Sequence, residues 1–278
     1  MKKKIIALVL AALMVAMCFV FAGCGGNSDA ETTKGEDEST LADTSASDLA
    51  YIQEKGTLIV GMTDYAPMNY KEDGSDEWTG FDTEFAQKVG EKLGVKVEFI
   101  EIDWDNKFFE LESKTIDCIW NGMTITDEAL KSSSVTNAYA KNAQVVVMAS
   151  EKLDDYADGA SIKDLKVVAE AGSAGEKEAK ALEIENYTAV KTQADALLEV
   201  KSGSADACII DITMANAMTG EGTSYAELGY KIELSTEEYG ISFRKGSDMT
   251  EKVNDLMAEL KADGTLTALA EKYELTLA

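Results

Sequence analysis

Short apolar runs and segments of helical spacing alternate along the first half of the chain from residue 49 onward. Residues 56–62 (GTLIVGM) form an apolar run between glycines, which is typical of a buried strand. Residues 81–94 place Phe81, Phe85, Val89 and Leu93 on one helical face and end at Gly94. A strand (95–102), a helix (104–114) and a strand (115–120) are predicted next. This β-α-β-α-β order predicts an α/β unit around a mostly parallel sheet.

The same pattern then starts again in the second half of the chain. Strands are predicted at residues 143–150, 165–172, 187–192 and 205–212, with helices at 173–183 and 193–203. One more strand is expected at 239–247, and residues 249–273 form helices that break at Gly264. The chain therefore predicts a second α/β unit that resembles the first.

A weak internal repeat supports this reading. Residues 111–122 (LESKTIDCIWNG) and 200–211 (VKSGSADACIID) both run from a helix end through a polar turn into a cysteine-bearing strand. Each strand ends in polar residues, after Trp120 in one unit and at Asp211 in the other. Ligands of open α/β sheets lie at the carboxyl ends of strands, so we expect both ends to face a common cleft.

The N-terminal sequence has the pattern of a secretory signal peptide. MKKK precedes an apolar stretch that ends in Phe21-Ala22-Gly23-Cys24, which resembles a bacterial lipobox with Phe in place of the usual aliphatic residue. We expect a signal peptide over 1–23, a lipidated Cys24 and a flexible acidic linker over 24–48. An unmodified Cys24 behind an uncleaved anchor is the alternative. Both place the rest of the chain outside the cell.

Charge and composition exclude several classes of function. The formal net charge is −25, which disfavours nucleic acid and anionic lipid as partners. The chain has no histidine, which excludes Ser-His-Asp and Cys-His catalysis and histidine-ligated zinc. Cys118 and Cys208 lie in apolar strand-like runs, so buried free thiols are expected rather than a disulfide. No metal or other cofactor is expected.

Nine short motifs occur in the order found in one family of binding proteins. They are GMTDYAPMNY, GFDTEFAQKVGEKLGVKVEFI, DWDNKFFELESKTID, GMTIT, AQVVVM, AEAGSAGE, ADACIID, EEYGISFRKGS and MAELKADGT. From about residue 55 to 275 the chain resembles the extracellular solute-binding proteins of ABC importers for polar amino acids, which have the type II periplasmic-binding fold.

The resemblance implies an α/β fold of two Rossmann-like lobes joined by two hinge strands. Lobe 1 would comprise residues 49–143 and 239–278, and lobe 2 residues 144–238. The hinges would lie near 144–148 and 239–243, and closure around a ligand between the lobes would be read by the permease. The implied protein is a lipid-anchored monomer on the outer side of the cell membrane, with an amino acid or related amine and ABC permease subunits as its partners.

The resemblance also assigns ligand-binding roles by position. Tyr65 matches an aromatic that covers the ligand, Trp104 a second cleft-wall position, and Asp211 the acid that holds an α-ammonium. The remaining matched positions are the small polar run Asn121, Gly122 and Thr124, the helix-start pair Ser173 and Ala174, and the variable side-chain contact Glu170. Structural alternatives stay open: Asp211 as a helix cap, Tyr65 and Trp104 as ordinary packing, and Glu170 as a solvated loop acid.

One position departs from the family. An arginine that clamps the ligand carboxylate normally follows the MTIT segment, and here that position is Ala129. Arg244 is the only arginine in the sequence. Lys131 or the backbone amides of 173–175 could hold the carboxylate instead, or the ligand lacks a free α-carboxylate. Because Asp211 and Glu170 are both acidic, we predict a ligand with at least one ammonium group.

These features favour a binding protein without catalytic activity. The alternative is an enzyme on the same scaffold, such as a dehydratase that uses Glu170 or Asp211 as a general acid with a raised pKa. Substrates of that kind carry carboxylates, and the site lacks the expected arginine. A ligand-sensing module is a further alternative.

Overall fold

The computed structural model describes residues 47–278 of the chain. The expected signal peptide over 1–23, the lipidated Cys24 and the linker up to residue 46 lie outside the described residues. Within 47–278, no helix is both long enough and apolar enough to cross a membrane.

Most strands of the described residues belong to one sheet. Its order is β4-β1-β5-β11-β7-β10-β8-β9, with β6 paired to β11. The strands are β1 (Thr57–Met62), β4 (Lys96–Glu101), β5 (Cys118–Thr124), β6 (Ser134–Val135), β7 (Ala140–Ala149), β8 (Lys166–Glu170), β9 (Asn186–Val190), β10 (Ala207–Asp211) and β11 (Leu228–Phe243). The outer pairs at each end are parallel, and the pairs that involve β7 or β11 are antiparallel.

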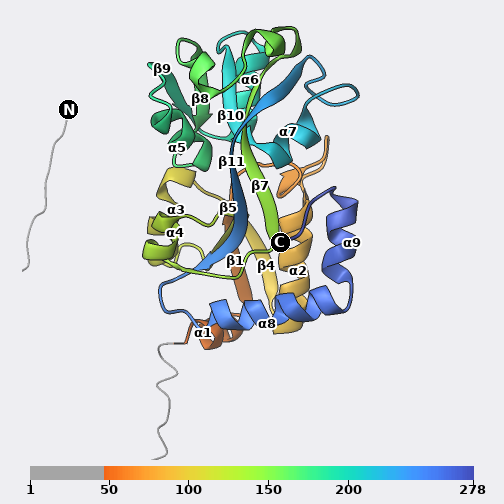
Figure 1. Cartoon of the computed structure of the whole chain (residues 1–278). Helices are drawn as coiled ribbons and strands as arrows, with labels where there is room; N and C mark the ends of the chain where they lie inside the picture. The colour runs from red at the N-terminus through yellow and green to blue at the C-terminus, as the bar shows by residue number, and fades with distance from the viewer. Residues whose placement is uncertain (1–46) are drawn as a thin grey trace, which may run out of the picture. The chain divides into compact units, whose positions relative to one another are not determined.

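We refer to the elements around β4-β1-β5 as lobe 1 (Figure 1). Its helices are α1 (Asp48–Lys55), α2 (Phe81–Leu93), α3 (Lys107–Glu112), α4 (Asp127–Ser132), α8 (Met249–Ala262) and α9 (Thr265–Lys272), with a 3₁₀ turn η2 (Trp104–Asn106). Phe85 and Val89 of α2 pack with Leu256 of α8 on one face of the sheet, whereas Leu111 of α3 packs with Ile119 on the other. Helices therefore cover both faces of this part of the sheet, as expected for parallel strands whose residues are mostly apolar.

The elements around β10-β8-β9 form lobe 2 (Figure 1). Its helices are α5 (Ala174–Ala181), α6 (Gln193–Lys201) and α7 (Ile212–Met218), with 3₁₀ turns η3 (Ser150–Asp155) and η4 (Gly159–Ile162). Ala179 of α5 packs in one apolar cluster, and Leu197 of α6 and Met214 of α7 pack in the other. The predicted repetition of an α/β unit is therefore present in the structure.

Two strands, β7 and β11, run from one lobe to the other. β11 pairs with β5 through Tyr239–Phe243, and β7 pairs with β10 through Gln144–Met148. Between these pairings, residues 141–143 of β7 and 236–238 of β11 form their sheet pairs with each other. The predicted hinge segments thus lie within the lobe sheets, and the crossing between lobes lies immediately beside them.

The structure also corrects several predicted bounds. β5 runs to Thr124 instead of ending at Trp120, because Met123 and Thr124 pair with β11. β11 begins at Leu228, well before the predicted residue 239, since its charged N-terminal half pairs along β7. Helices α1 and α7 and the short pair β2 (Tyr70–Lys71) and β3 (Trp78–Thr79) were not predicted.

The cysteine prediction is confirmed: Cys118 in β5 and Cys208 in β10 are buried free thiols. Burial raises the pKa of both thiols, which leaves them protonated and unreactive at neutral pH. The helix break at Gly264 is also present, because this glycine takes a φ of +84° between α8 and α9.

Candidate ligand-binding cleft

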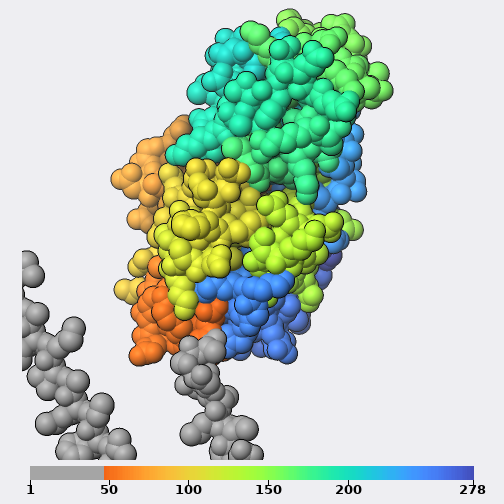
Figure 2. Space-filling view, turned by 90° about the vertical axis from the view of Figure 1, so that its left-hand side faces the viewer, coloured from red at the N-terminus to blue at the C-terminus, as the bar shows by residue number. Residues whose placement is uncertain are grey.

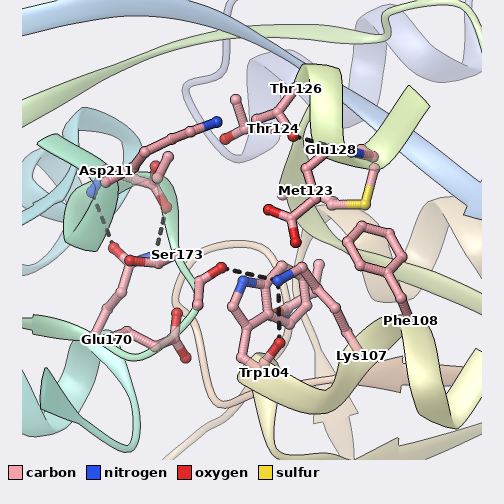
Figure 3. Close-up of a pocket in the computed structure, with 17 residues that line it drawn as sticks. Trp104, Lys107, Phe108, Met123, Thr124, Thr126, Glu128, Glu170, Ser173 and Asp211 are labelled. Atoms are coloured by element: carbon pink, nitrogen blue, oxygen red, sulfur yellow. Dashed lines mark hydrogen bonds between the residues drawn. The ribbon is translucent and has the colours of Figure 1, made fainter. Parts of the chain in front are cut away.

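A cavity of about 50 Å³ lies between the two lobes, at the carboxyl ends of β5 and β10. On the face shown in Figure 2, the yellow surface that includes α3 abuts the teal surface that includes α5. Of the predicted site residues, the following line the cavity: Trp104, Asn121, Gly122, Thr124, Glu170, Ser173, Ala174 and Asp211. The structure therefore brings residues from both halves of the sequence to one place (Figure 3).

Asp211 is held by amide side chains and does not cap a helix. It occupies the N-cap position of α7, but its carboxylate makes no capping bond there. Its Oδ1 accepts hydrogen bonds from Asn142 Nδ2 at 2.6 Å and Gln144 Nε2 at 2.5 Å, and its Oδ2 accepts one from Gln193 Nε2. Burial raises the pKa of Asp211, and these amide donors oppose the rise.

Glu237 shares the amide donors of Asp211 at the crossing between the lobes. Asn142 Nδ2 and Gln144 Nε2 donate to Glu237 Oε1 at 2.6 and 2.8 Å. Thr124 Oγ1 of lobe 1 donates to the same oxygen at 3.0 Å. Burial and the neighbouring Asp211 raise the pKa of Glu237 to about 8. This hydrogen-bond network thus connects Asp211, on the cavity wall of lobe 2, with β7 and β11, the two strands that cross between the lobes.

Glu170 places a buried carboxyl group on the cavity wall. It ends β8, is 2% exposed, and its Oε1 has no hydrogen-bond partner among residues 47–278. Burial, together with the charge of Asp211, raises the pKa of Glu170 to about 8. A buried carboxyl oxygen without a donor is costly, on the order of 1–3 kcal/mol. The group is therefore not a solvated loop acid.

The small polar run of β5 forms the lobe 1 side of the cavity floor. The Asn121 side chain pairs with the backbone of Thr63, which donates N–H to Oδ1 and accepts from Nδ2, both at 3.0 Å. Gly122 has a φ of +56°, and its N–H donates to Asp82 Oδ2 at 2.7 Å. These polar groups are used by the protein itself, so they fix the shape of the floor.

Two of the predicted aromatic residues are mainly packed in the protein. Tyr65 does not line the cavity: it is 1% exposed and its hydroxyl lies 2.6 Å from that of Tyr239. It lies behind Gly122, where an added Cβ would meet the Tyr65 ring at 2.6 Å. Trp104 does line the cavity, and it also packs in the apolar cluster with Leu111. Ligand contact by Tyr65 remains a prediction.

The position of the missing arginine lies on the cavity wall. Ala129 is buried and lines the cavity. Arg244 lies elsewhere in lobe 1, where it pairs with Asp48 and Asp117. Lys131, one of the predicted substitutes, is exposed and does not line the cavity.

Lys107 is a cavity residue that the sequence analysis missed. It begins α3, is 7% exposed, and its ammonium donates to Trp104 O at 3.1 Å and to Gly172 O at 2.8 Å (Figure 3). Burial lowers its pKa, and nearby carboxylates, Glu128 first, oppose the fall. Its spacing of three residues from Trp104 places both on one helical face, which is the signal that could have found it.

Further missed residues are Phe108, Met123, Thr126 and Glu128 of lobe 1 and Gly172, Lys177 and Gln193 of lobe 2, all of which line the cavity. Gln193 matters most among them, because it both donates to Asp211 and accepts the Asp211 N–H at 2.9 Å. It stands directly after the N-cap Thr192, so sequence pattern alone assigns it to an ordinary helix start. No group of three or more potential metal ligands occurs among the described residues.

The start of α5 presents backbone donors to the same cavity. Ser173 caps the helix, since its Oγ accepts from Glu176 N at 3.1 Å. Ala174 and Gly175 are the first two helical residues, whose N–H groups have no partner within a helix. Such N–H groups, with the helix dipole, favour an anion.

The chain is similar in sequence to a known family of proteins. The model of the bacterial extracellular solute-binding proteins, family 3, matches residues 58–276. The L-cystine-binding protein TcyA of Bacillus subtilis (strain 168) is 29% identical, over 98% of this chain and 97% of its own length. The arginine-binding extracellular protein ArtP of the same organism is 32% identical, over 94% and 96%.

A solved structure gives the same result. An amino acid ABC transporter substrate-binding protein from Streptococcus pneumoniae, bound to L-arginine, superposes with a TM-score of 0.74 at 26% identity. The match covers 84% of this chain and all of the other. The predicted type II fold is confirmed by such neighbours. The relatives are described as binding proteins, which supports the prediction that the chain is not an enzyme.

Proposed function

The chain belongs to family 3 of the bacterial extracellular solute-binding proteins, and from that membership we propose that it binds a small amino-acid-like or amine-bearing solute between its lobes and delivers it to an ABC permease. Relatives named for cystine and arginine, and an arginine-bound neighbour from an ABC transporter, support this solute class. The binding residues we propose are those of the cavity wall, with Asp211 and Glu170 as the groups that receive the cationic part of the solute.

The observation that carries the proposal is the pair of buried carboxyl groups on one cavity wall. Asp211 is 4% exposed and Glu170 is 2% exposed, and both belong to lobe 2. Buried carboxylates without a cationic partner are unfavourable. No ion pair involves either group among residues 47–278. A ligand ammonium or guanidinium would supply that charge.

Ligand entry would require the lobes to separate. The cavity of about 50 Å³ is far smaller than the roughly 300–1,000 Å³ that is typical of ligand pockets. Residues 141–143 and 236–238, which connect the lobes, are the proposed hinge. Because Asn142 and Glu237 belong to the hydrogen-bond network of Asp211, ligand binding at Asp211 would act directly on the hinge.

The test of the solute class is a thermal-shift screen of the protein amino acids, cystine and simple amines, followed by calorimetry. A ligand that binds the native state stabilises it by about 2.7 kcal/mol at a hundredfold excess over Kd. We expect Asp211→Asn to weaken binding at least about tenfold, because a charge-assisted bond is lost. Asp164→Asn, an exposed change in the same lobe, is the control. Unchanged binding by Asp211→Asn would reject the ammonium-binding role.

We also propose that Cys24 is lipidated and anchors the protein at the outer face of the membrane beside its permease. The lipobox-like Phe21-Ala22-Gly23-Cys24 supports this proposal. Intact mass and palmitate labelling of the expressed protein test it. A Cys24→Ser variant released into the medium supports the anchor, whereas an unmodified Cys24 in a membrane-retained chain indicates an uncleaved signal instead.

A further inference from the structure

The positive charge of Lys107 lies inside the cleft, where the family position for arginine holds Ala129. The ammonium is directed to the junction of the lobes, because it donates to Trp104 O of lobe 1 and to Gly172 O of lobe 2 (Figure 3). Gly172 also approaches lobe 1 closely: a Cβ there would lie 2.6 Å from Asp105 Cα. Lys107 therefore contacts both walls that a ligand between the lobes would touch.

This ammonium forms no ion pair within the described part of the chain, although the carboxylates of Glu128 and Glu170 act on it from a longer distance. Lys107 forms no ion pair among residues 47–278 and is 7% exposed. An ammonium has three N–H donors, and two of them are used by the carbonyl groups of Trp104 and Gly172. A buried cation without an anionic partner in contact is unfavourable, so an anion that enters the cavity and contacts the ammonium would be stabilised there.

Lobe 2 supplies further donors on the same cavity. The N–H groups that open α5, after the cap at Ser173, are free of helical partners, and Ala174 lines the cavity together with Lys107. Ala129, with only a methyl group, leaves the space that a longer side chain would fill. An ammonium from lobe 1 and amides from lobe 2 thus surround one site for an anionic group.

Charges of both signs therefore line one cavity. Lys107 is the buried cation, and the buried acids are Glu170, whose Oε1 is without a partner, and Asp211. We propose that the Lys107 ammonium and the amides at the start of α5 bind the carboxylate of a zwitterionic ligand whose cationic group lies at Glu170 and Asp211. The proposal rests on the proposed function and names the solute class: amino acids with a free carboxylate rather than simple amines.

The experiment compares each amino acid with its carboxyl-free analogue. Binding of L-arginine and agmatine, and of L-cystine and cystamine, is measured by calorimetry on the wild-type protein. For whichever pair binds, we expect the amino acid to bind roughly tenfold to a hundredfold more tightly than the amine, because only the carboxylate pairs with Lys107. An amine that binds as tightly as its amino acid overturns the proposal without any variant.

Lys107→Met removes the charge and retains the aliphatic stem. We expect it to weaken amino-acid binding roughly tenfold or more and to leave amine binding within about twofold, so that the preference disappears. Lys131→Met, the same change at an exposed position of the same lobe, should retain the preference. Thermal melting confirms that each variant is folded. Equal losses for amino acid and amine would show a purely structural role for Lys107 and reject the proposal.

Failure of the proposed function gives a different result. If neither pair and none of the other protein amino acids bind to the wild-type chain, the solute class itself is wrong. If amino acids bind but Lys107→Met leaves their Kd unchanged, the solute class stands and the role of Lys107 is wrong. The wild-type measurement therefore tests the solute class, and the Lys107→Met measurement tests the role of Lys107.

Discussion

Glu170, a proposed ligand-binding residue, lowers the stability of the ligand-free fold. Its carboxyl group is buried at the end of β8, with one oxygen lacking a donor. The unfolded chain ionises this group at an ordinary pKa, whereas burial raises the folded-state pKa to about 8. Between these values the folded state must retain a proton that the unfolded state releases, so the side chain destabilises the ligand-free fold as the pH rises.

The first prediction concerns Glu170→Gln. The variant should be more stable than the wild-type protein at pH 8, by roughly 1–3 kcal/mol, because the neutral amide is cheaper to bury than a carboxylate. Binding of a cationic solute should weaken at least about tenfold. Urea unfolding at pH 8 and calorimetry measure the two effects. Glu185→Gln, an exposed change in lobe 2, should leave both unchanged, and a less stable Glu170→Gln protein would contradict this account.

The sequence located residues of the cavity wall where a motif marks a strand end, and it missed those whose position depends on contacts across the cleft. Asp211 and Glu170 lie at strand ends, which pattern alone can find. Lys107 is an ordinary helix residue by sequence, and its role depends on Gly172, 65 positions away. Tyr65 was matched to a ligand contact, but its burial behind Gly122 depends on the pairing of β5 with β11.

At the scale of elements, the β8–α5 turn of lobe 2 lies close against η2 of lobe 1. Gly172 has a φ of +70°, and an added Cβ would lie 2.6 Å from Asp105 Cα and 2.9 Å from its carboxylate. These atoms belong to opposite lobes. Glycine is required here both for the left-handed conformation and for the contact.

The second prediction is that Gly172→Ala favours a more open arrangement of the lobes. The clash can be relieved by rotation at residues 141–143 and 236–238, so ligand binding should weaken, by about tenfold or more. Small-angle scattering should report a larger radius of gyration with ligand present than for the wild type. Gly203→Ala is the matched control, because Gly203 has a φ of +77° and nothing within 4 Å of its added Cβ. Equal effects of the two variants would show that backbone strain alone is responsible.

Element prediction from the sequence was best where both faces of a strand or one helical face are apolar. α2, β1 and β10 were expected close to their observed bounds for that reason. β11 was recognised only in its buried final part, because residues 228–238 are charged and pair along β7 with one side exposed. β5 was expected to end at Trp120, since Asn121 and Gly122 read as a turn, although they continue the strand with their polar groups bonded internally.

For the molecule as a whole, several buried carboxyl groups share the behaviour of Glu170. Burial raises the pKa of Asp82 to about 7 and, with Asp211, that of Glu237 to about 8. All three groups bind more protons in the folded than in the unfolded state between about pH 5 and pH 8. Stability changes with pH in proportion to the difference in bound protons, so it must fall as the pH rises through this window.

The third prediction is therefore a ligand-free protein that is more stable at pH 5.5 than at pH 8.5, by several kcal/mol, because each pKa unit corresponds to about 1.4 kcal/mol. Urea unfolding across this range measures the trend. Glu170→Gln should flatten it by removing one of the contributing groups. Constant or rising stability toward pH 8.5 would show that these carboxyl groups are ionised in the folded protein at no cost.

The fourth prediction is that ligand binding releases protons from the buried carboxyl groups. A cationic group placed at Glu170 and Asp211 favours their ionised forms and lowers both pKa values, so the complex must release protons that the free protein holds. At pH 7 we expect the release of about one proton per ligand bound, and affinity should rise between pH 6 and pH 8. Calorimetry in phosphate and in Tris measures the proton release, because the two buffers take up a proton with different enthalpies and the apparent binding enthalpy therefore differs between them.

The Glu170→Gln variant tests whether the released proton comes from Glu170. In Glu170→Gln the group cannot ionise, so the dependence of the binding enthalpy on the buffer should decrease, whereas Glu185→Gln should retain it. A wild-type enthalpy that is the same in both buffers would mean that the solute brings no cation to these carboxyl groups. If protons are released, this result and the Lys107 measurements locate the two ends of the solute independently. The anionic end would lie at the junction of the lobes, and the cationic end at the buried acids of lobe 2.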